Sequence, residues 1–287
     1  MRNREIETMI QAVPTADGAG VKLSRTLGSR RDLRLDPFLL LDEFSSDNAS
    51  DYIAGFPAHP HRGFETLTYM LDGHMRHEDH MGNRGDLKPG DVQWMRAGRG
   101  IIHSEMPQQT AGRMRGFQLW VNLPAAEKMQ PAQYRDIPAA QIPQLDLEGG
   151  GLVKVIAGAF EQNGQTRYGP INGTENPLTT DLQYLDIQLP AGADLRVPVD
   201  AQLNALLFVF EGAVQLQGQD VPLHNAAILG PGNGVAIQTG AQPARLLLLA
   251  GKPLNEPVAQ YGPFVMNTTD EVEQAIRDYQ AGTLTQA

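Results

Sequence analysis

The sequence lacks cysteine entirely, although it is 287 residues long. This absence excludes disulfide frameworks, thiolate zinc sites, iron–sulfur clusters and a cysteine nucleophile. Any metal ion must therefore be bound by nitrogen and oxygen ligands.

Basic residues are also scarce, because 23 Lys and Arg stand against 33 Asp and Glu, which gives a formal net charge of -10. A general nucleic-acid-binding protein presents a basic face to the phosphates, so we expect no direct contact with nucleic acid. The acidic balance permits a protein partner without identifying one.

Long apolar runs are absent as well. Stretches such as 205–210 and 246–250 are far shorter than the roughly 20 residues that a helix needs to span a bilayer. The N-terminal residues 1–7 contain no apolar core of a secretory signal. We therefore expect a cytoplasmic protein that does not bind membranes.

Turn-forming residues, by contrast, are abundant, with 30 Gly and 20 Pro spread between short apolar stretches. The stretches 65–71, 116–121, 182–189 and 205–210 are examples, and each is bounded by Gly, Pro, Asp or Asn. Short strands at regular intervals, without helical periodicity between them, favour an all-β sandwich or barrel over a parallel α/β sheet.

One helix is predicted, close to the C-terminus. Thr268 followed by Glu271 has the spacing of a capping box, and Gly282 provides a stop. The apolar residues between them form one stripe on a helix: Val272, Ala275, Ile276 and Tyr279.

A weak internal repeat indicates two related domains. Gly73 ends a predicted strand as Gly212 does, and the segment 96–101 resembles the segment 230–235. We therefore predict two tandem antiparallel β-barrels, followed by the short C-terminal helix.

The boundary between these barrels is expected in the Pro-rich stretch 124–143. The predicted ranges are 1–135 for an N-terminal, metal-binding barrel and 136–287 for a C-terminal barrel that carries the helix.

Two pairs of side chains have the spacing of metal ligands. His59 and His61 lie two residues apart, so both imidazoles point to one face of an extended strand, and His103 and Glu105 repeat this spacing. On neighbouring strands the pairs would converge on one cation with three nitrogens and one oxygen. Such a set suits Fe(II), Mn, Ni, Cu or Zn and leaves open positions for water, substrate or dioxygen.

The repeat provides an internal comparison for this site. The positions in the second copy that correspond to the four candidate ligands hold Pro198, Asp200, Ile237 and Thr239. Three of the four cannot serve as comparable ligands. We therefore predict one divalent transition metal per chain, in the N-terminal barrel.

Other titratable residues leave alternatives open. Glu65 shares the strand face of His61 and is either a further ligand or a buried polar group. The polar hairpin with His74, His77 and His80 is either a second metal site or, as we prefer, a solvated loop. His224 is interpreted as structural.

The segments 56–69 and 90–107, which contain all four candidate ligands, resemble the pirin family of the cupin superfamily. The segments 36–44, 116–124 and 262–267 resemble it as well, so the likeness extends over almost the whole chain. The resemblance implies a bicupin with iron in the N-terminal barrel, held by His59, His61, His103 and Glu105.

The resemblance also implies an activity, that of a quercetin 2,3-dioxygenase. Its substrates would be a flavonol and dioxygen, and ring cleavage would release carbon monoxide. Our mechanistic hypothesis is that Fe(II) binds the 3-hydroxyl and the adjacent carbonyl of the flavonol, while Glu105 removes the hydroxyl proton as general base.

Two alternatives belong to other classes of function. The first is a non-enzymatic, iron-dependent regulator or redox sensor that acts through protein–protein contacts, as the resemblance to eukaryotic members implies. The second is a metal-dependent isomerase of sugars or keto compounds, which the same ligands would permit.

Overall fold

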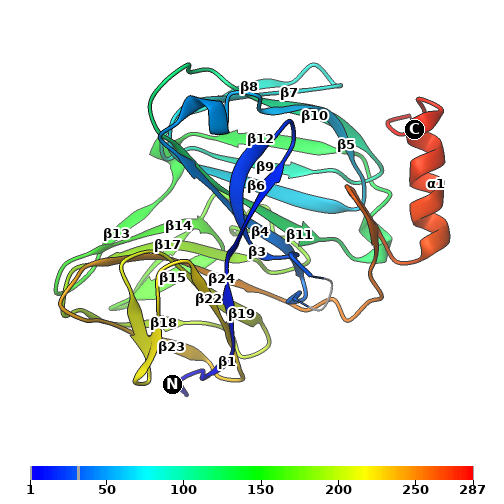
Figure 1. Ribbon diagram of the computed structural model, residues 1–287. Coiled ribbons are helices and arrows are strands. Elements are labelled where there is room, and N and C mark those ends of the chain that lie inside the picture. The colour runs from blue at the N-terminus through cyan, green and yellow to red at the C-terminus, as the bar shows by residue number, and fades with distance from the viewer. Residues whose placement is uncertain (1, 31–32, 287) are drawn as a thin grey trace. The chain divides into compact units, whose positions relative to one another are not determined.

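The computed structural model describes residues 2–30 and 33–286, and this part of the chain forms 26 strands, three short 3₁₀ segments and one α-helix (Figure 1). The predicted all-β class with a short C-terminal helix is therefore confirmed. No helix in the described part of the chain is long and apolar enough to cross a membrane.

The chain folds into two compact units that are not continuous in sequence. The first unit comprises the described residues of Val13–Arg34, Phe38–Ala139 and Leu254–Ala287. The second unit comprises those of Met1–Ala12, Leu35–Pro37 and Ala140–Pro253. The predicted ranges 1–135 and 136–287 treat each domain as one continuous segment. In the structure, the N-terminal segment belongs to the second unit and the C-terminal segment to the first.

The first unit consists mainly of two antiparallel sheets. The larger sheet has seven strands in the order β12 (Gln133–Ile137), β9 (Val92–Arg96), β6 (Phe64–Asp72), β11 (Met114–Asn122), β4 (Phe38–Ser46), β3 (Val21–Leu27) and β2 (Val13–Asp17). The smaller sheet has four strands in the order β5 (Phe56–His61), β10 (Ile101–Pro107), β7 (Met75–Asp79) and β8 (Arg84–Leu87). A short hairpin of β25 (Ala259–Tyr261) and β26 (Phe264–Met266) completes its strands.

The second unit repeats this arrangement. Its seven-stranded sheet has the order β1 (Ile6–Gln11), β22 (Asn225–Leu229), β19 (Asn204–Glu211), β24 (Ala244–Gly251), β17 (Gln183–Leu189), β14 (Leu152–Ala157) and β13 (Gln144–Asp146). Its four-stranded sheet has the order β18 (Asp194–Pro198), β23 (Gly234–Thr239), β20 (Val214–Leu216) and β21 (Gln219–Val221). A separate hairpin contains β15 (Ala159–Gln162) and β16 (Gln165–Tyr168).

The predicted internal repeat is thus visible in the strand order, because β6 and β19 hold the same place in the two large sheets. Among the described residues of each unit, no strand pairing connects the large sheet to the small sheet, so the two sheets do not form one closed barrel. Each predicted barrel is therefore an open fold of two sheets. The remaining 3₁₀ segments are Ala49–Asp51, Ala125–Glu127 and Ala139–Gln141.

The large sheet of the first unit has two chemically different faces. Thr68 and Gln118 are paired across β6 and β11 and line a cavity. The next position on each strand points to the opposite face, since side chains alternate along a strand. There Leu67, Leu119 and Leu41 form a row of fully buried leucines.

The interior of the second unit is filled with aliphatic side chains instead. One continuous cluster of buried apolar residues contains members of both of its sheets, such as Leu207, Ile237 and Leu246. Such a packed interior stabilises the unit and provides no polar groups for chemistry.

The helix α1 (Thr269–Gln280) begins with the predicted capping box. The Thr268 hydroxyl accepts a hydrogen bond from the Glu271 amide at 3.3 Å, and the Glu271 carboxylate accepts one from the Thr268 amide at 2.9 Å. Val272 and Ala275 are buried on its inner face, and the cluster that they join includes Ile102 of β10. The helix therefore packs on the first unit, beside its small sheet (Figure 1).

Arg62 links this helix to the end of β5. Its buried guanidinium donates hydrogen bonds to the carbonyl of Arg99, to the Asp278 carboxylate at 2.7 Å and to the carbonyl of Leu284 at 3.1 Å. The C-terminal segment is thus tied directly to the residue that follows His61.

Replacing Arg62 with Ala should lower the free energy of unfolding by about 2–4 kcal/mol, because one charge-assisted and two carbonyl hydrogen bonds are lost. Urea unfolding followed by tryptophan fluorescence measures this loss. The signal reports on the first unit, because both tryptophans of the chain, Trp94 and Trp120, belong to it.

The matched control is Arg277→Ala on the same helix. The ion pair of Arg277 with Glu273 spans 3.7 Å between side chains that are more than half exposed, so its loss should change stability by less than about 0.5 kcal/mol. An equally small loss for Arg62→Ala would mean that apolar contacts alone hold the helix.

Candidate metal centre and adjoining cavity

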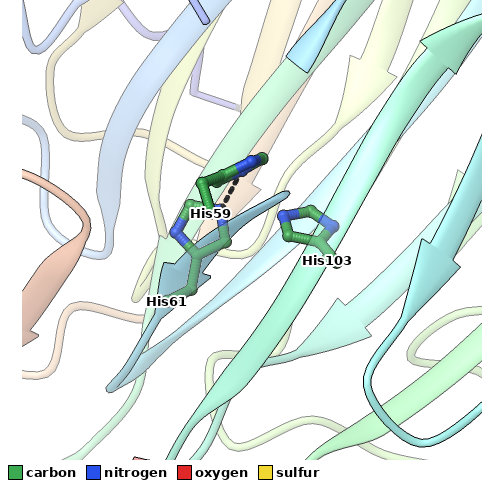
Figure 2. A group of neighbouring side chains, drawn as sticks. All are labelled: His59, His61 and His103. Atoms are coloured by element: carbon green, nitrogen blue, oxygen red, sulfur yellow. Dashed lines mark hydrogen bonds between the residues drawn. The ribbon is translucent and has the colours of Figure 1, made fainter. Parts of the chain in front are cut away.

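Three histidines meet where β5 pairs with β10. His59 lies directly opposite His103, and His61 lies opposite Ile101. The ring centroids of the three imidazoles are 4.3–4.9 Å apart, and one nitrogen from each ring falls within 4.8 Å of the others (Figure 2). The structure therefore brings together three of the four predicted ligands.

The hydrogen bonds of these rings suit a cation. Nδ1 of His59 lies 2.8 Å from the carbonyl of Pro57; by donating there, the ring keeps the lone pair of Nε2 for a ligand. Nε2 of His103 is buried without a hydrogen-bond partner. The Nε2 atoms of His59 and His61 are 3.0 Å apart. Two nitrogens bound at right angles, each about 2.1 Å from one metal, would have a similar separation of about 3.0 Å.

The rings of His61 and His103 are also held in the neutral form that a metal requires. Burial is the main cause that lowers the pKa of both imidazoles well below the usual range, and neighbouring histidines add to the effect. Neutral imidazoles with a free buried nitrogen fit a divalent transition metal.

Glu105 lies beside the three rings but outside their close group. Among the described residues, the side chains with mutually close ligand atoms are the three histidines, without this carboxylate. The pairing of β10 with β5 is irregular between His103 and Glu105, because the extra residue lies on β5, whereas β10 pairs regularly with β7 and keeps Glu105 on the strand face of His103. Whether Glu105 is a fourth ligand stays a prediction.

The Glu105 carboxylate is nevertheless part of the same site. It is buried, lines the cavity next to His59 and His61, and lies 3.2 Å from the Thr68 hydroxyl, which can donate to it. Burial raises the pKa of Glu105, while His59 and the hydrogen bond from Thr68 oppose that rise.

The sequence left open whether Glu65 is a further metal ligand or a buried polar group, and in the structure it is a buried polar group. Its carboxylate accepts a hydrogen bond from Nε of Arg96 at 2.9 Å and is fully enclosed. Burial raises the pKa of Glu65 to about 6 against the influence of Arg96. This carboxylate serves an ion pair rather than the histidine cluster.

The three histidines of the hairpin do not converge on a second site. His74 pairs with Asp86 at 2.9 Å, and His80 accepts a hydrogen bond from the Ile102 amide at 3.3 Å. His77 is fully buried, and its Nδ1 lies 3.3 Å from Nδ1 of His103. The prediction of a solvated loop is therefore wrong for His77.

His77 supports the histidine cluster from behind. Its ring lies between His103 and Tyr134, with centroid distances of 4.8 and 4.7 Å. Burial lowers the pKa of His77 to about 4, so the ring is neutral and can accept the Nδ1 proton of His103. The signal in the sequence was the alternation with Met75, an apolar residue two positions earlier on the same strand face.

A cavity of about 710 Å³ opens beside the cluster, within the first unit. This volume is in the range of small-molecule sites. Its polar lining includes the site residues and a group that the sequence analysis did not select: Arg25, Asp42, Thr68 and Gln118. Its apolar walls include Leu40, Phe44 and Trp120.

The described residues of the second unit contain no equivalent cluster. Ile237 is fully buried in its aliphatic core, and Asp200 is exposed. Within the part of the chain that the structure describes, His59, His61 and His103 form the one group of at least three close His, Asp or Glu ligand atoms.

Comparison with known proteins assigns both halves of the chain. Residues 20–121, which contain the histidine cluster, match the family model of pirin, and residues 184–285 match the model of the pirin C-terminal cupin domain. The chain belongs to the pirin family. The resemblance found in the sequence motifs is thus confirmed, and with it the bicupin fold.

Relatives of the pirin family match over nearly the full length. A Pseudomonas aeruginosa protein named "Putative quercetin 2,3-dioxygenase" is 51% identical over 99% of both chains. Human pirin is 37% identical, covering 96% of this chain and 92% of its own. A crystal structure of quercetin 2,3-dioxygenase from Acinetobacter baumannii is 34% identical, with a TM-score of 0.88 over 98% of both chains.

His77→Phe should weaken binding of Zn²⁺ or Ni²⁺ by about tenfold or more, because groups that orient a ligand ring contribute about 10–100-fold to metal affinity. Phe retains the ring between His103 and Tyr134 and removes the nitrogen that faces His103. Competition with a chromophoric chelator gives the affinity.

His74→Phe is the control, since His74 is partly exposed and pairs with Asp86 away from the cluster. Its metal affinity should equal that of the unmodified protein. If His77→Phe matched the control, the packing of His103 alone would set the orientation of its ring.

Proposed function

We propose that this protein is a metal-dependent dioxygenase that cleaves flavonols such as quercetin with dioxygen. The observation that carries the proposal is a cluster of three imidazoles and a buried carboxylate, opening onto a cavity with apolar walls. The likeness to a solved quercetin 2,3-dioxygenase along 98% of the chain supports the same reaction class.

His59, His61 and His103 would hold the metal, with Glu105 as the fourth ligand that the sequence predicts. Iron(II) is our first choice, and Mn, Ni, Cu and Zn suit the same donors. A divalent metal bound there would act as a Lewis acid on the substrate hydroxyl and place the substrate beside dioxygen.

Glu105 is proposed as the general base that takes the proton of the flavonol 3-hydroxyl. Its position supports this role, because the carboxylate is buried, lines the cavity and lies next to two of the imidazoles. The hydroxyl of Thr68 lies 3.2 Å from Oε1 of Glu105 and would leave Oε2 available to take the proton.

The apolar walls of the cavity suit a flat aromatic molecule. Trp120 contacts the ring of His61 edge-on, with a centroid distance of 5.3 Å, and lines the cavity together with Leu40 and Phe44. These side chains would stack on the substrate and exclude bulk water from the reacting atoms.

Glu105→Gln should reduce the rate of flavonol cleavage by at least about 100-fold, the contribution typical of a positioned general base. The three imidazoles should still retain the metal. Flavonol absorbance and released carbon monoxide measure turnover, and elemental analysis measures the metal.

Glu65→Gln is the matched control, because Glu65 is a buried carboxylate that pairs with Arg96 instead of lining the cavity. It should keep the turnover of the unmodified protein. Full turnover and full metal content in Glu105→Gln would contradict the role of Glu105 as base.

Removal of the metal with a chelator should abolish flavonol cleavage, and anaerobic addition of about one equivalent of Fe(II) per chain should restore it, since the described chain offers one cluster. Elemental analysis and the flavonol assay on the same sample check this. Stoichiometric iron without turnover would favour the alternative of an iron-dependent regulator, and no bound metal after loading would contradict both functions.

A further inference from the structure

A row of polar side chains crosses the large sheet of the first unit. Each member lies directly opposite the next on the neighbouring strand: Arg25, Asp42, Gln118, Thr68 and Gln93. Residues paired in this way share one face of a sheet. The first four line the cavity, so the row belongs to the wall beside the metal centre.

The two ends of the cavity-lining part of this row are chemically distinct. At one end, Nε and Nη2 of Arg25 donate to the two oxygens of Asp42 at 2.8 and 2.7 Å. At the other end, the Thr68 hydroxyl lies 2.5 Å from the Gln118 side chain and 3.2 Å from the Glu105 carboxylate. The row therefore leads from an ion pair to the carboxylate of the metal centre.

The second unit shows that this fold does not require a polar row. The corresponding positions, paired in the same order, hold only apolar residues: Val155, Leu185, Leu248, Leu207 and Ala227. The correspondence follows the repeat, because Thr68 precedes Gly73 by as many residues as Leu207 precedes Gly212. All five apolar residues belong to the packed core of that unit.

Stability therefore does not explain the ion pair of Arg25 and Asp42. The pair is largely removed from water, with side-chain exposures of 20% for Arg25 and 5% for Asp42, and such pairs are often replaced by apolar residues without loss of stability. The pair also retains hydrogen-bonding groups that a ligand could use. Nη1 of Arg25 makes no hydrogen bond to any residue that the structure describes, and each oxygen of Asp42 retains an unused lone pair.

The local charge selects the kind of ligand. Asp17 also accepts a hydrogen bond from Arg25, at 2.8 Å, so two carboxylates surround one guanidinium. This balance disfavours an anionic group. It favours neutral hydroxyls, which can donate to a carboxylate and accept from the guanidinium.

A ligand that contacts both ends of the cavity-lining row must be elongated. Arg25 and Thr68 are separated by three strand spacings of about 4.8 Å, which places their backbones roughly 14 Å apart. A molecule with two ring systems in line could contact Glu105 with one end and the ion pair with the other, between the apolar walls.

We propose that Arg25 and Asp42 form a recognition subsite for two adjacent phenolic hydroxyls on the ring of the substrate that lies remote from the metal ligands. This inference rests on the proposed flavonol-cleaving function and extends it by naming the hydroxylation pattern. One hydroxyl donates to the Asp42 carboxylate, and Nη1 of Arg25 donates to the oxygen of the other.

The test compares quercetin with galangin, which differ only in the two adjacent hydroxyls of the outer ring. Dissociation constants are measured on the full chain loaded with redox-inert Zn²⁺, through quenching of the fluorescence of Trp120, which lines the cavity. We expect quercetin to bind at least about tenfold more tightly, because an analogue without the hydroxyls leaves buried polar groups unpaired.

The double variant Arg25→Met/Asp42→Leu removes both charges of the pair together, so neither is left unpaired in the wall. Asp17 also loses its bond to Arg25, but its side chain is 52% exposed and stays hydrated. Leu is also the residue at the corresponding position of the second unit, Leu185. The preference for quercetin should fall to near parity in this variant. Zinc content and melting temperature show that the variant is folded, and the ratio of kcat/KM for the two flavonols in the iron-loaded protein provides a second readout.

Arg84→Met/Glu78→Leu is the control, because it removes an exposed ion pair of the same unit away from the cavity. It should keep the preference. If the unmodified protein bound and cleaved both flavonols equally well, the subsite would be disproved while the proposed function stood. If neither flavonol bound, both proposals would be wrong.

Discussion

The candidate metal centre depends on the register between β5 and β10. A shift of one residue would turn His59 and His61 to the other face of the sheet and leave His103 alone. The turn after His61 maintains this register, because its glycine, Gly63, has a φ of +91° and a Cβ there would meet the carbonyl of Val265 at 1.9 Å. The backbone at this point accepts no other residue without rearrangement.

Buried cations hold the same turn from two sides. Lys128 is buried and donates to the carbonyls of Gly63 and Val265 at 2.7 and 3.1 Å, and to the Asn122 side chain at 2.6 Å. Burial lowers the pKa of Lys128 to about 8, so it remains largely protonated at neutral pH. Arg62 completes the arrangement with its bonds to the C-terminal segment. Buried charges are costly unless they are paired or hydrogen-bonded. Each of these two cations makes three hydrogen bonds, Lys128 to carbonyl oxygens alone and Arg62 to two carbonyls and one carboxylate.

The two units show how one fold serves different purposes. Both have a four-stranded sheet with the same strand order and a seven-stranded sheet in which six strands share one order, while the seventh, edge strand is β12 in the first unit and β1 in the second. Aliphatic residues fill the interior of the second unit, whereas polar side chains such as Asp42, Gln118 and Thr68 line a hollow in the first. The strand pattern therefore specifies the fold, and a few interior positions decide whether it encloses a core or a site.

The sequence by itself determined what depends on local spacing. Short strands between turn residues indicated the all-β class, the capping box marked the helix, and the two-residue spacing of His59 and His61 put both rings on one strand face. The tertiary structure alone decided that His77 stands behind His103, that Glu65 pairs with Arg96, and that each end of the chain joins the unit formed by distant residues. The reason is physical: periodicity along a strand shows which side chains share a face, but only the register between strands far apart in sequence decides which faces meet.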